Sequence, residues 1–274
     1  MTTRIVDVRG KKVELLESGS GEPVLYLHDM WDLHTAQGGM FPFHEQLAAK
    51  FKLMAPAHPG CGESDSIKSI ADMDDLAFHY LDVLDALNLS SAAIVGVGLG
   101  GWLGVEIAVR NPERVSRLAL VGAAGLQMPG AQVADIFMYS QHRDGGVMRD
   151  LRNLLFGDAD GALANSIVPD GRTNIPDEVR RYKSLTLAGR VGWEPPYLHN
   201  RKLLGRLHRV ACPALLIWGE EDRFVPLANG RAYAQNLPKA TLKTLPGCGH
   251  SAILEAPEQC MDWIAPFLKT GALG

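Results

Sequence analysis

Short apolar runs alternate with amphipathic segments along most of the chain, and this pattern predicts parallel strands joined by helices. Two strands with alternating polar and apolar positions are expected first, at residues 4–9 and 12–17, with Gly10 as the turn between them. Continuous apolar runs, which suit strands buried on both faces of a sheet, follow at 24–27, 52–57, 92–97, 117–121, 214–218 and 241–245. The pattern predicts an α/β fold, a doubly wound and mostly parallel sheet of eight strands with helices on both faces.

Helical patterns lie between these strands. Residues 72–87 begin with several acids near the positive end of the expected helix. Their apolar side chains recur on one face, at Leu76, Tyr80, Leu84 and Leu87. Residues 99–110 form a second helical pattern, which stops before Asn111-Pro112.

The stretch at 124–204 interrupts this rhythm, because it has no clear strand pattern. It shows helical patches around 133–141 and 148–156. Since strand patterns resume after it, we predict an inserted, mostly helical cap at 124–204. The remaining residues, 1–123 and 205–274, then form the core domain.

Composition limits the partners and the location. The 274 residues carry a formal net charge of −4, which gives no sign of a nucleic-acid-binding surface. No apolar run reaches the roughly 18 residues of a membrane span, and the first residues lack a signal-peptide pattern. Cys61, Cys212, Cys248 and Cys260 have neither pairing nor metal-ligand spacing. We therefore expect free thiols in the cytoplasm, no metal or other cofactor, and a small-molecule substrate; a homodimer stays open.

The strongest candidate for chemistry is the sharp turn predicted after the strand at 92–97. Its sequence G-V-G-L-G has the setting of a nucleophile elbow, G-x-S-x-G, in which a strained turn exposes a serine at the top of a sheet. Here the central residue is Gly98, which has no side chain with which to attack a substrate. A covalent serine intermediate is therefore excluded for this chain.

Two later loops supply the other groups of a catalytic triad, in the order elbow, acid, histidine. Asp222 lies in W-G-E-E-D after a predicted strand, and His250 lies in the glycine-rich segment G-C-G-H after the last one. The acid would accept the histidine Nδ1–H, fix its tautomer and stabilise the imidazolium. Glu220 and Glu221 are competing acids, and a surface-loop histidine is the simpler interpretation of His250.

With these residues the chain resembles capped α/β-hydrolases of the esterase and C–C hydrolase type, over essentially its whole length. The resemblance also rests on His28 after the third strand and on H-P-G-C-G-E-S-D, which begins at His58. It implies that Asp222, in the pattern W-G-x-x-D, is the acid in preference to the neighbouring glutamates. It also implies an oxyanion hole formed by the backbone N–H groups of Met30 and Leu99.

One position beside this oxyanion hole departs from the family. His28-Asp29 stands where the family has His-Gly. A carboxylate there opposes the stabilisation of an anion unless it is neutral or points elsewhere. Asp29 is therefore either a loop carboxylate without a role or a repurposed catalytic acid or base.

The substrate pocket is expected at the carboxyl ends of the strands, between core and cap. A fold alone does not define a reaction. The residues that line the pocket are therefore assigned only by residue type and by position in the chain. Besides Asp29, the candidates for substrate contact are apolar or aromatic: Trp31, Met40, Phe41, Met138, Tyr139 and Trp193. They predict a small, largely apolar substrate.

The missing serine leaves several mechanisms open. In the first, His250 with Asp222 activates water in the space freed above Gly98, and the enzyme hydrolyses an ester, a lactone or a C–C bond beside a ketone. In the second, His250 deprotonates the substrate itself, as in a lyase, a decarboxylase or a cofactor-free oxygenase. An inactive ligand-binding relative and an engineered serine-to-glycine variant are further alternatives. We predict a hydrolase acting on a carbonyl compound.

Two other interpretations have less support. The elbow also matches G-x-G-x-x-G, but it follows several strands, and the next strand ends without the acid that a dinucleotide site requires. Cys61 and Cys248 are the thiols nearest to the family's active-site loops. A reactive thiol needs a cation or a helix N-terminus beside it, and the sequence shows neither.

Overall fold

The computed structural model describes most of the chain. The described residues are 1–35, 39–136, 147–171, 174–193 and 197–272.

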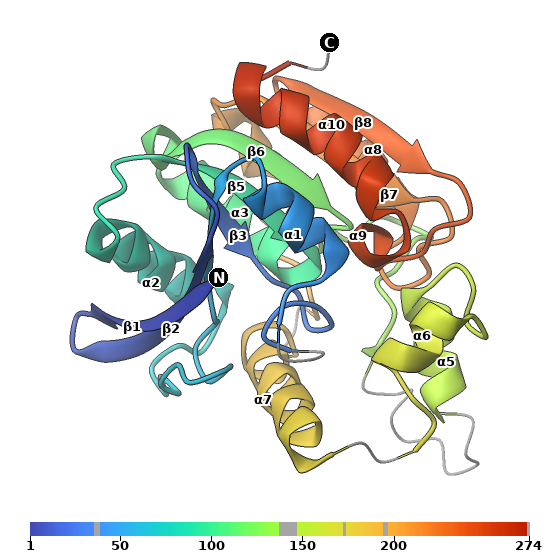
Figure 1. Cartoon of the computed structure of the whole chain (residues 1–274). Helices are drawn as coiled ribbons and strands as arrows, with labels where there is room; N and C mark the ends of the chain where they lie inside the picture. The colour runs from blue at the N-terminus through green and yellow to red at the C-terminus, as the bar shows by residue number, and fades with distance from the viewer. Residues whose placement is uncertain (36–38, 137–146, 172–173, 194–196, 273–274) are drawn as a thin grey trace.

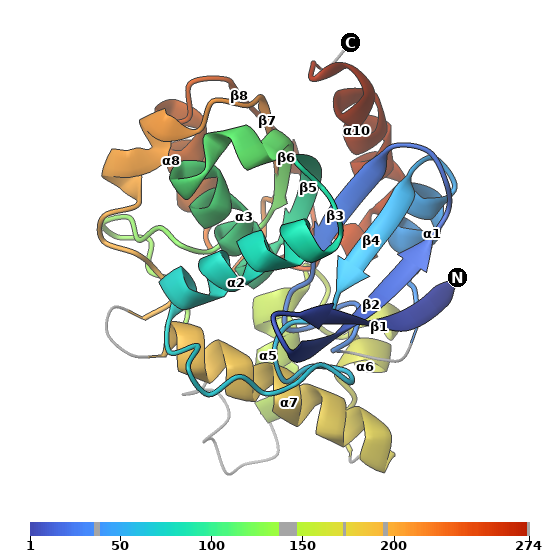
Figure 2. The same cartoon turned by 90° about the vertical axis from the view of Figure 1, so that its left-hand side faces the viewer.

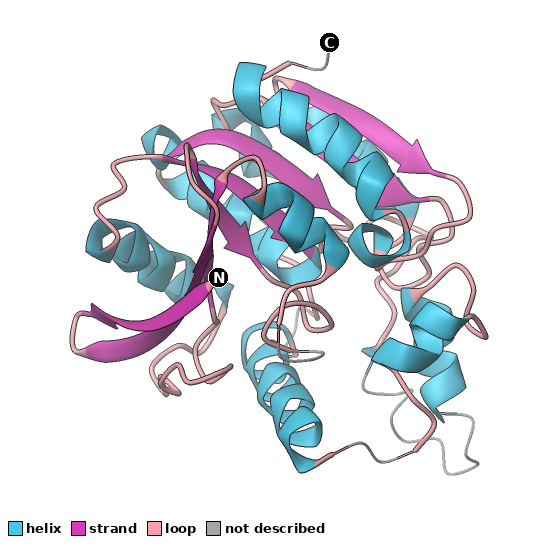
Figure 3. Cartoon of the chain, in the orientation of Figure 1, coloured by secondary structure: helices cyan, strands magenta, loops and turns pink. Residues whose placement is uncertain are grey.

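Eight strands form one twisted sheet, as predicted, drawn in magenta in Figure 3. They are β1 Thr2–Val8, β2 Lys11–Ser18, β3 Pro23–Leu27, β4 Lys52–Pro56, β5 Ala92–Val97, β6 Val115–Val121, β7 Ala214–Gly219 and β8 Ala240–Leu245. Their order in the sheet is β1-β2-β4-β3-β5-β6-β7-β8. β1 and β2 pair antiparallel and β2 pairs antiparallel with β4, whereas the strands from β4 to β8 are parallel.

Helices cover both faces of this sheet, which confirms the doubly wound arrangement. The core helices are α1 Pro42–Ala48, α2 Met73–Ala86, α3 Gly98–Arg110, α8 Leu227–Asn236, α9 Ala252–Glu255 and α10 Pro257–Thr270, with 3-10 turns η1 Pro112–Arg114 and η2 Leu204–Arg209. α1 and α10 lie side by side on one face, and α2, α3 and α8 lie on the other (Figures 1 and 2).

The predicted helix at 72–87 shows why sequence and structure agree here. The Asp72 side chain accepts a hydrogen bond from the Asp75 N–H and caps the first turn. Leu76, Tyr80 and Leu84 are buried on one face, as the spacing predicts. The cap at Asp72 defines where this helix begins, and the buried face defines which side of it packs on the core.

Among the described residues between β6 and β7, the α-helices are α5 Val147–Leu155, α6 Ala162–Ile167 and α7 Ile175–Gly192. They lie beyond the carboxyl ends of the parallel strands (Figure 1). The helical patch predicted at 148–156 corresponds to α5, whereas most of the patch at 133–141 lies outside the described residues. The limits of the cap, 124–204, stay a prediction.

Candidate active site

The turn between β5 and α3 has the backbone of a nucleophile elbow. The helix begins at Gly98, whose φ of +51° lies in the left-handed region that glycine adopts without strain. Gly100 lets α3 approach β3: a Cβ there would lie 2.7 Å from the His28 carbonyl oxygen and closer still to that of Leu27. The predicted elbow is therefore present in its backbone, although position 98 carries no nucleophile.

Asp222 and His250 meet at the carboxyl ends of β7 and β8, as predicted. His250 Nδ1 lies 2.9 Å from Asp222 Oδ2. The other carboxylate oxygen, Oδ1, accepts the Phe224 N–H at 3.0 Å and the Val225 N–H at 2.8 Å. The Phe224 ring packs edge-on against the imidazole, with centroids 4.8 Å apart. Backbone donors and a ring thus hold both partners in place.

The competing glutamates have other contacts. Glu220 accepts a hydrogen bond from the Thr244 hydroxyl at 2.8 Å, and Glu221 pairs with Arg223 at 3.2 Å. Both are exposed, whereas Asp222 is 6% exposed. The geometry therefore favours Asp222 as the partner of His250.

Asp29 fills the place that a serine side chain would take. Its Oδ1 accepts the Leu99 N–H at 2.9 Å, and its Oδ2 lies 3.4 Å from His250 Nε2. A Cβ built on Gly98 would overlap the whole carboxylate, since even Oδ2, the most distant of its three atoms, would be 2.7 Å away. The expectation of free space above Gly98 is therefore wrong, because the Asp29 carboxylate, from the loop after β3, lies in that space.

The loop after β3 is built to hold Asp29 in this position. The Asp29 N–H donates to Asp32 Oδ1 at 3.1 Å, and the Asp29 carbonyl oxygen accepts from the Thr35 hydroxyl at 3.3 Å and lies 2.8 Å from His28 Nδ1. Asp32 in turn accepts a hydrogen bond from the Tyr26 hydroxyl. These contacts anchor the backbone on both sides of the carboxylate.

The family histidines His28 and His58 are structural here. The His58 N–H donates to His28 Nε2 at 3.0 Å, and His58 Nε2 lies 2.9 Å from the His28 carbonyl oxygen. Burial lowers the pKa of His28 well below its usual value and that of His58 to about 4. Both rings are therefore neutral near pH 7 and join the β3 and β4 loops.

The site holds a buried cation between two carboxylates. Burial by itself lowers the pKa of His250, but Asp222 and Asp29 together raise it to about 10. Burial raises the pKa of Asp222 against the opposing effect of His250. His250 is 1% exposed, and its Nε2 has no hydrogen-bond partner among the described residues. At neutral pH the imidazole is therefore protonated, and its Nε2 lies 3.4 Å from Asp29 Oδ2.

This protonation predicts a pH dependence of stability. Because the folded pKa of His250 is about 10 and the ordinary value is 6.5, its stabilising contribution is complete below pH 6.5 and is lost as the pH rises through 10. The free energy of unfolding, measured by urea denaturation, should fall between pH 7 and pH 10 more steeply in the wild-type protein than in His250→Gln. Equal slopes would show that His250 is neutral in the folded state.

One of the two predicted oxyanion donors already binds a group of the chain itself. The Leu99 N–H points at Asp29 Oδ1, so this donor serves a carboxylate of the protein. The Met30 carbonyl oxygen accepts from the Ser184 hydroxyl of α7 at 3.2 Å, which ties the β3 loop to the helices above it. The role of the Met30 N–H stays a prediction.

The predicted substrate contacts are only partly placed. Trp31 and Phe41 are buried in the core, and Met40 is half-buried. Trp193, at the end of α7, is 42% exposed and packs edge-on against Tyr197. Met138 and Tyr139 lie outside the described residues. Their contact with a substrate stays a prediction.

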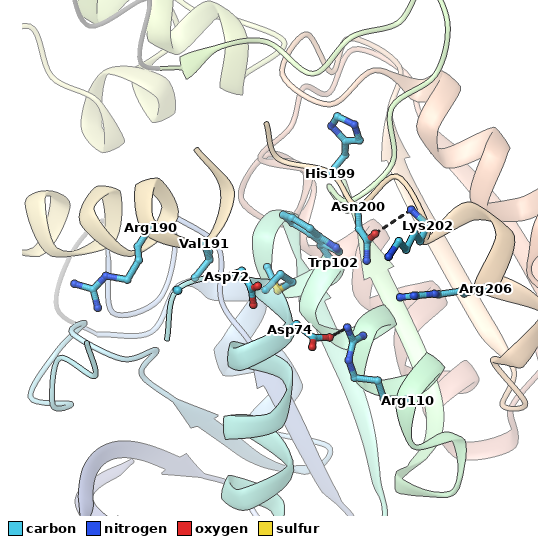
Figure 4. Close-up of a pocket in the computed structure, with 12 residues that line it drawn as sticks. Asp72, Asp74, Trp102, Arg110, Arg190, Val191, His199, Asn200, Lys202 and Arg206 are labelled. Atoms are coloured by element: carbon cyan, nitrogen blue, oxygen red, sulfur yellow. Dashed lines mark hydrogen bonds and ion pairs between the residues drawn. The ribbon is translucent and has the colours of Figure 1, made fainter. Parts of the chain in front are cut away.

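A polar cavity that the sequence did not predict lies where α7 and the segment after it face α2 and α3 (Figure 4). Its volume is about 430 Å³. The charged or polar side chains that line it include Asp72, Asp74, Arg110, Arg190, Lys202 and Arg206. Arg110 pairs with Asp74 and with Glu106, so much of the charge is compensated locally. A cavity between core and cap helices was expected, but this one does not include Asp29, Gly98, Asp222 or His250.

The thiol alternatives find no support in the geometry. All four cysteines are free, as expected. Burial raises the pKa of Cys61 to about 12 and that of Cys248 to about 11, which disfavours the nucleophilic thiolate. Within the described ranges, no group of three metal-ligating side chains could hold an ion, and no helix has the length and apolar character to cross a membrane.

Comparison with known proteins identifies the fold family. A family model described as alpha/beta hydrolase fold matches residues 38–257. A 2-hydroxy-6-oxononadienedioate/2-hydroxy-6-oxononatrienedioate hydrolase from Burkholderia vietnamiensis is 29% identical over 276 residues, 94% of this chain and 91% of that protein. The hydrolase of the same name from Paraburkholderia phymatum is 30% identical over 80% of this chain and 77% of its own. The solved 2-hydroxy-6-oxo-6-phenylhexa-2,4-dienoate hydrolase from a Rhodococcus species has a TM-score of 0.74 at 25% identity, covering 97% of this chain and 98% of its own.

Proposed function

Since the chain belongs to the alpha/beta hydrolase fold family, we propose that it hydrolyses a C–C bond beside a ketone in a small, largely apolar carbonyl compound. Relatives along nearly the whole chain are named as hydrolases of 6-oxo dienoic acids, compounds that carry such a ketone. These names support a C–C bond beside a ketone as the bond that is cleaved. Esters and lactones share the same carbonyl chemistry and belong in the same set of test substrates.

The observation that carries this proposal is the buried His250–Asp222 pair beside the Gly98–Leu99 turn. Hydrolysis beside a ketone requires water to add to the carbonyl carbon and a proton to reach the departing carbon. A buried imidazolium held by a carboxylate can supply that proton. Exclusion of bulk water strengthens the electrostatic effect of every charge in the site.

Proton transfer without hydrolysis, as in a lyase, is the second candidate function. The occupied Leu99 N–H favours it, because the usual donor to a substrate oxyanion is taken by Asp29. The two functions differ in the fate of water. Hydrolysis in ¹⁸O-labelled water places the label in a carboxylate product, whereas a lyase releases products without it.

The test is turnover of 6-oxo dienoates, β-diketones, aryl esters and lactones by the wild-type protein and by His250→Ala. We expect wild-type hydrolysis of at least one ketone substrate, and a loss of kcat of about 10²–10⁴-fold in His250→Ala because the proton donor is gone. His208→Ala, on the exposed turn η2, is the matched control and should keep the wild-type rate. Absence of any hydrolysis, or full activity of His250→Ala, would overturn the proposal.

A further inference from the structure

Among the described residues, the Asp29 carboxyl group faces His250 from the side opposite Asp222. Its Oδ2 is 3.4 Å from Nε2, and Asp29 is 4% exposed. Burial of a carboxylate is unfavourable unless partners compensate for the lost hydration. Here the compensation comes from the Leu99 N–H and the His250 charge, both of which belong to the candidate active site. A loop carboxylate without a role would have no need of this position.

Resting on the proposed function of this site, we propose that Asp29 is the general base of the reaction and that His250 is its general acid. The two groups then divide the work that a neutral histidine does alone in a serine hydrolase. The division follows from the geometry: one oxygen of Asp29 is fixed by Leu99, and the other faces the reaction side of the imidazole.

The chemical steps balance for a ketone R–CO–R′. Asp29 Oδ2 takes a proton from water while the water oxygen bonds to the carbonyl carbon. The C–R′ bond then breaks, its electron pair stays on R′, and R′ takes the proton of His250 Nε2. The proton on Asp29 passes across to His250 Nε2 and restores the starting state. The products are R–COOH and R′–H, so one water is consumed and neither oxidant nor reductant is needed.

An oxyanion develops on the substrate whether Asp29 attacks the carbonyl carbon itself or activates a water molecule, and in both cases the Leu99 N–H stays bound to Asp29 Oδ1. The positive charge of His250, whose Nε2 lies 3.4 Å from Asp29 Oδ2, is then the group beside the developing negative charge. An isotope experiment distinguishes a base from a covalent nucleophile.

Asp29→Asn tests the assignment, because asparagine keeps the shape of the side chain and an oxygen for the Leu99 N–H but cannot take the proton. With the ketone substrate of the wild-type protein, kcat should fall about 10²–10⁴-fold while KM changes little. Glu220→Gln, an exposed acid of the nearby loop, is the matched control and should keep the wild-type kcat. Wild-type kcat in Asp29→Asn would overturn the inference, and if His250→Ala were inactive at the same time, the proposed function would stand.

Two further measurements separate the base from other roles. After many turnovers in ¹⁸O-labelled water, the peptide that contains Asp29 should carry no label; label in its carboxylate would identify a nucleophile and overturn the assignment. Asp29→Gly, in which the site is left open, should regain activity with added formate in a saturable manner. Failure of formate to raise kcat in a folded Asp29→Gly protein would show that Asp29 acts on the structure and not on the proton.

Discussion

Gly98→Ser alone should leave the protein without serine-hydrolase activity, whereas Asp29→Gly combined with Gly98→Ser should create it. In the single variant the new side chain would enter the volume of the Asp29 carboxylate, which lies within 2.7 Å of any Cβ at position 98. In the double variant this carboxylate is absent. The Leu99 N–H then becomes free for a substrate oxyanion, and the serine hydroxyl can reach His250.

The measurement is hydrolysis of an aryl acetate, together with covalent labelling by a fluorophosphonate that reacts with activated serines. We expect the double variant to exceed Gly98→Ser by about 10²–10³-fold in kcat, the effect of one oxyanion donor, and to react with the probe. Asp29→Gly without the serine is the control and should not be labelled. Equal labelling of Gly98→Ser and the double variant would mean that the Asp29 carboxylate moves aside at no cost.

Asp222→Asn should lower kcat for the ketone substrate by about 10⁴-fold, as the loss of this charge does in Ser-His-Asp triads. Asparagine preserves the shape of the side chain and an oxygen for the Phe224 and Val225 N–H groups, but removes the charge that helps to raise the pKa of His250. The imidazole would then be a poorer cation and less firmly oriented.

Nuclear magnetic resonance of the His250 ring should show a lower pKa in this variant than in the wild-type protein, because the Asp222 charge that raises it is gone. Asp262→Asn, on the exposed side of α10, is a control that removes the same charge without touching the site. A pKa of His250 that does not fall in Asp222→Asn, or a kcat equal to that of the control, would contradict the role assigned to Asp222.

The parts of the site that follow strands could be predicted from the sequence. Apolar runs located the parallel strands to within a few residues, and the carboxyl ends of such strands lie along one edge of the sheet. Asp222 and His250, which follow β7 and β8, are therefore expected at the same edge as the turn at Gly98. The loops after β7 and β8 then bring the two side chains together.

The position of Asp29 could not be predicted in this way. Its carboxylate reaches a backbone N–H that is 70 residues away in the chain, and its direction is set by hydrogen bonds within a loop that has no periodic pattern. A signal was nevertheless present, because the sequence departs from the family at two positions, 29 and 98. The structure shows that the two departures compensate each other in volume: a side chain is gained at 29 where one is lost at 98.

This exchange of volume also limits the order in which the two positions can change during evolution. A chain with aspartate at 29 and serine at 98 would place two side chains in one space, so introducing either one while the other is present lowers stability. A route between the two forms of the site that avoids this overlap passes through a chain that carries neither the aspartate at 29 nor the serine at 98. Such a chain has neither the carboxylate nor the serine hydroxyl. In relatives with that combination, selection for catalysis at this site would be weakest.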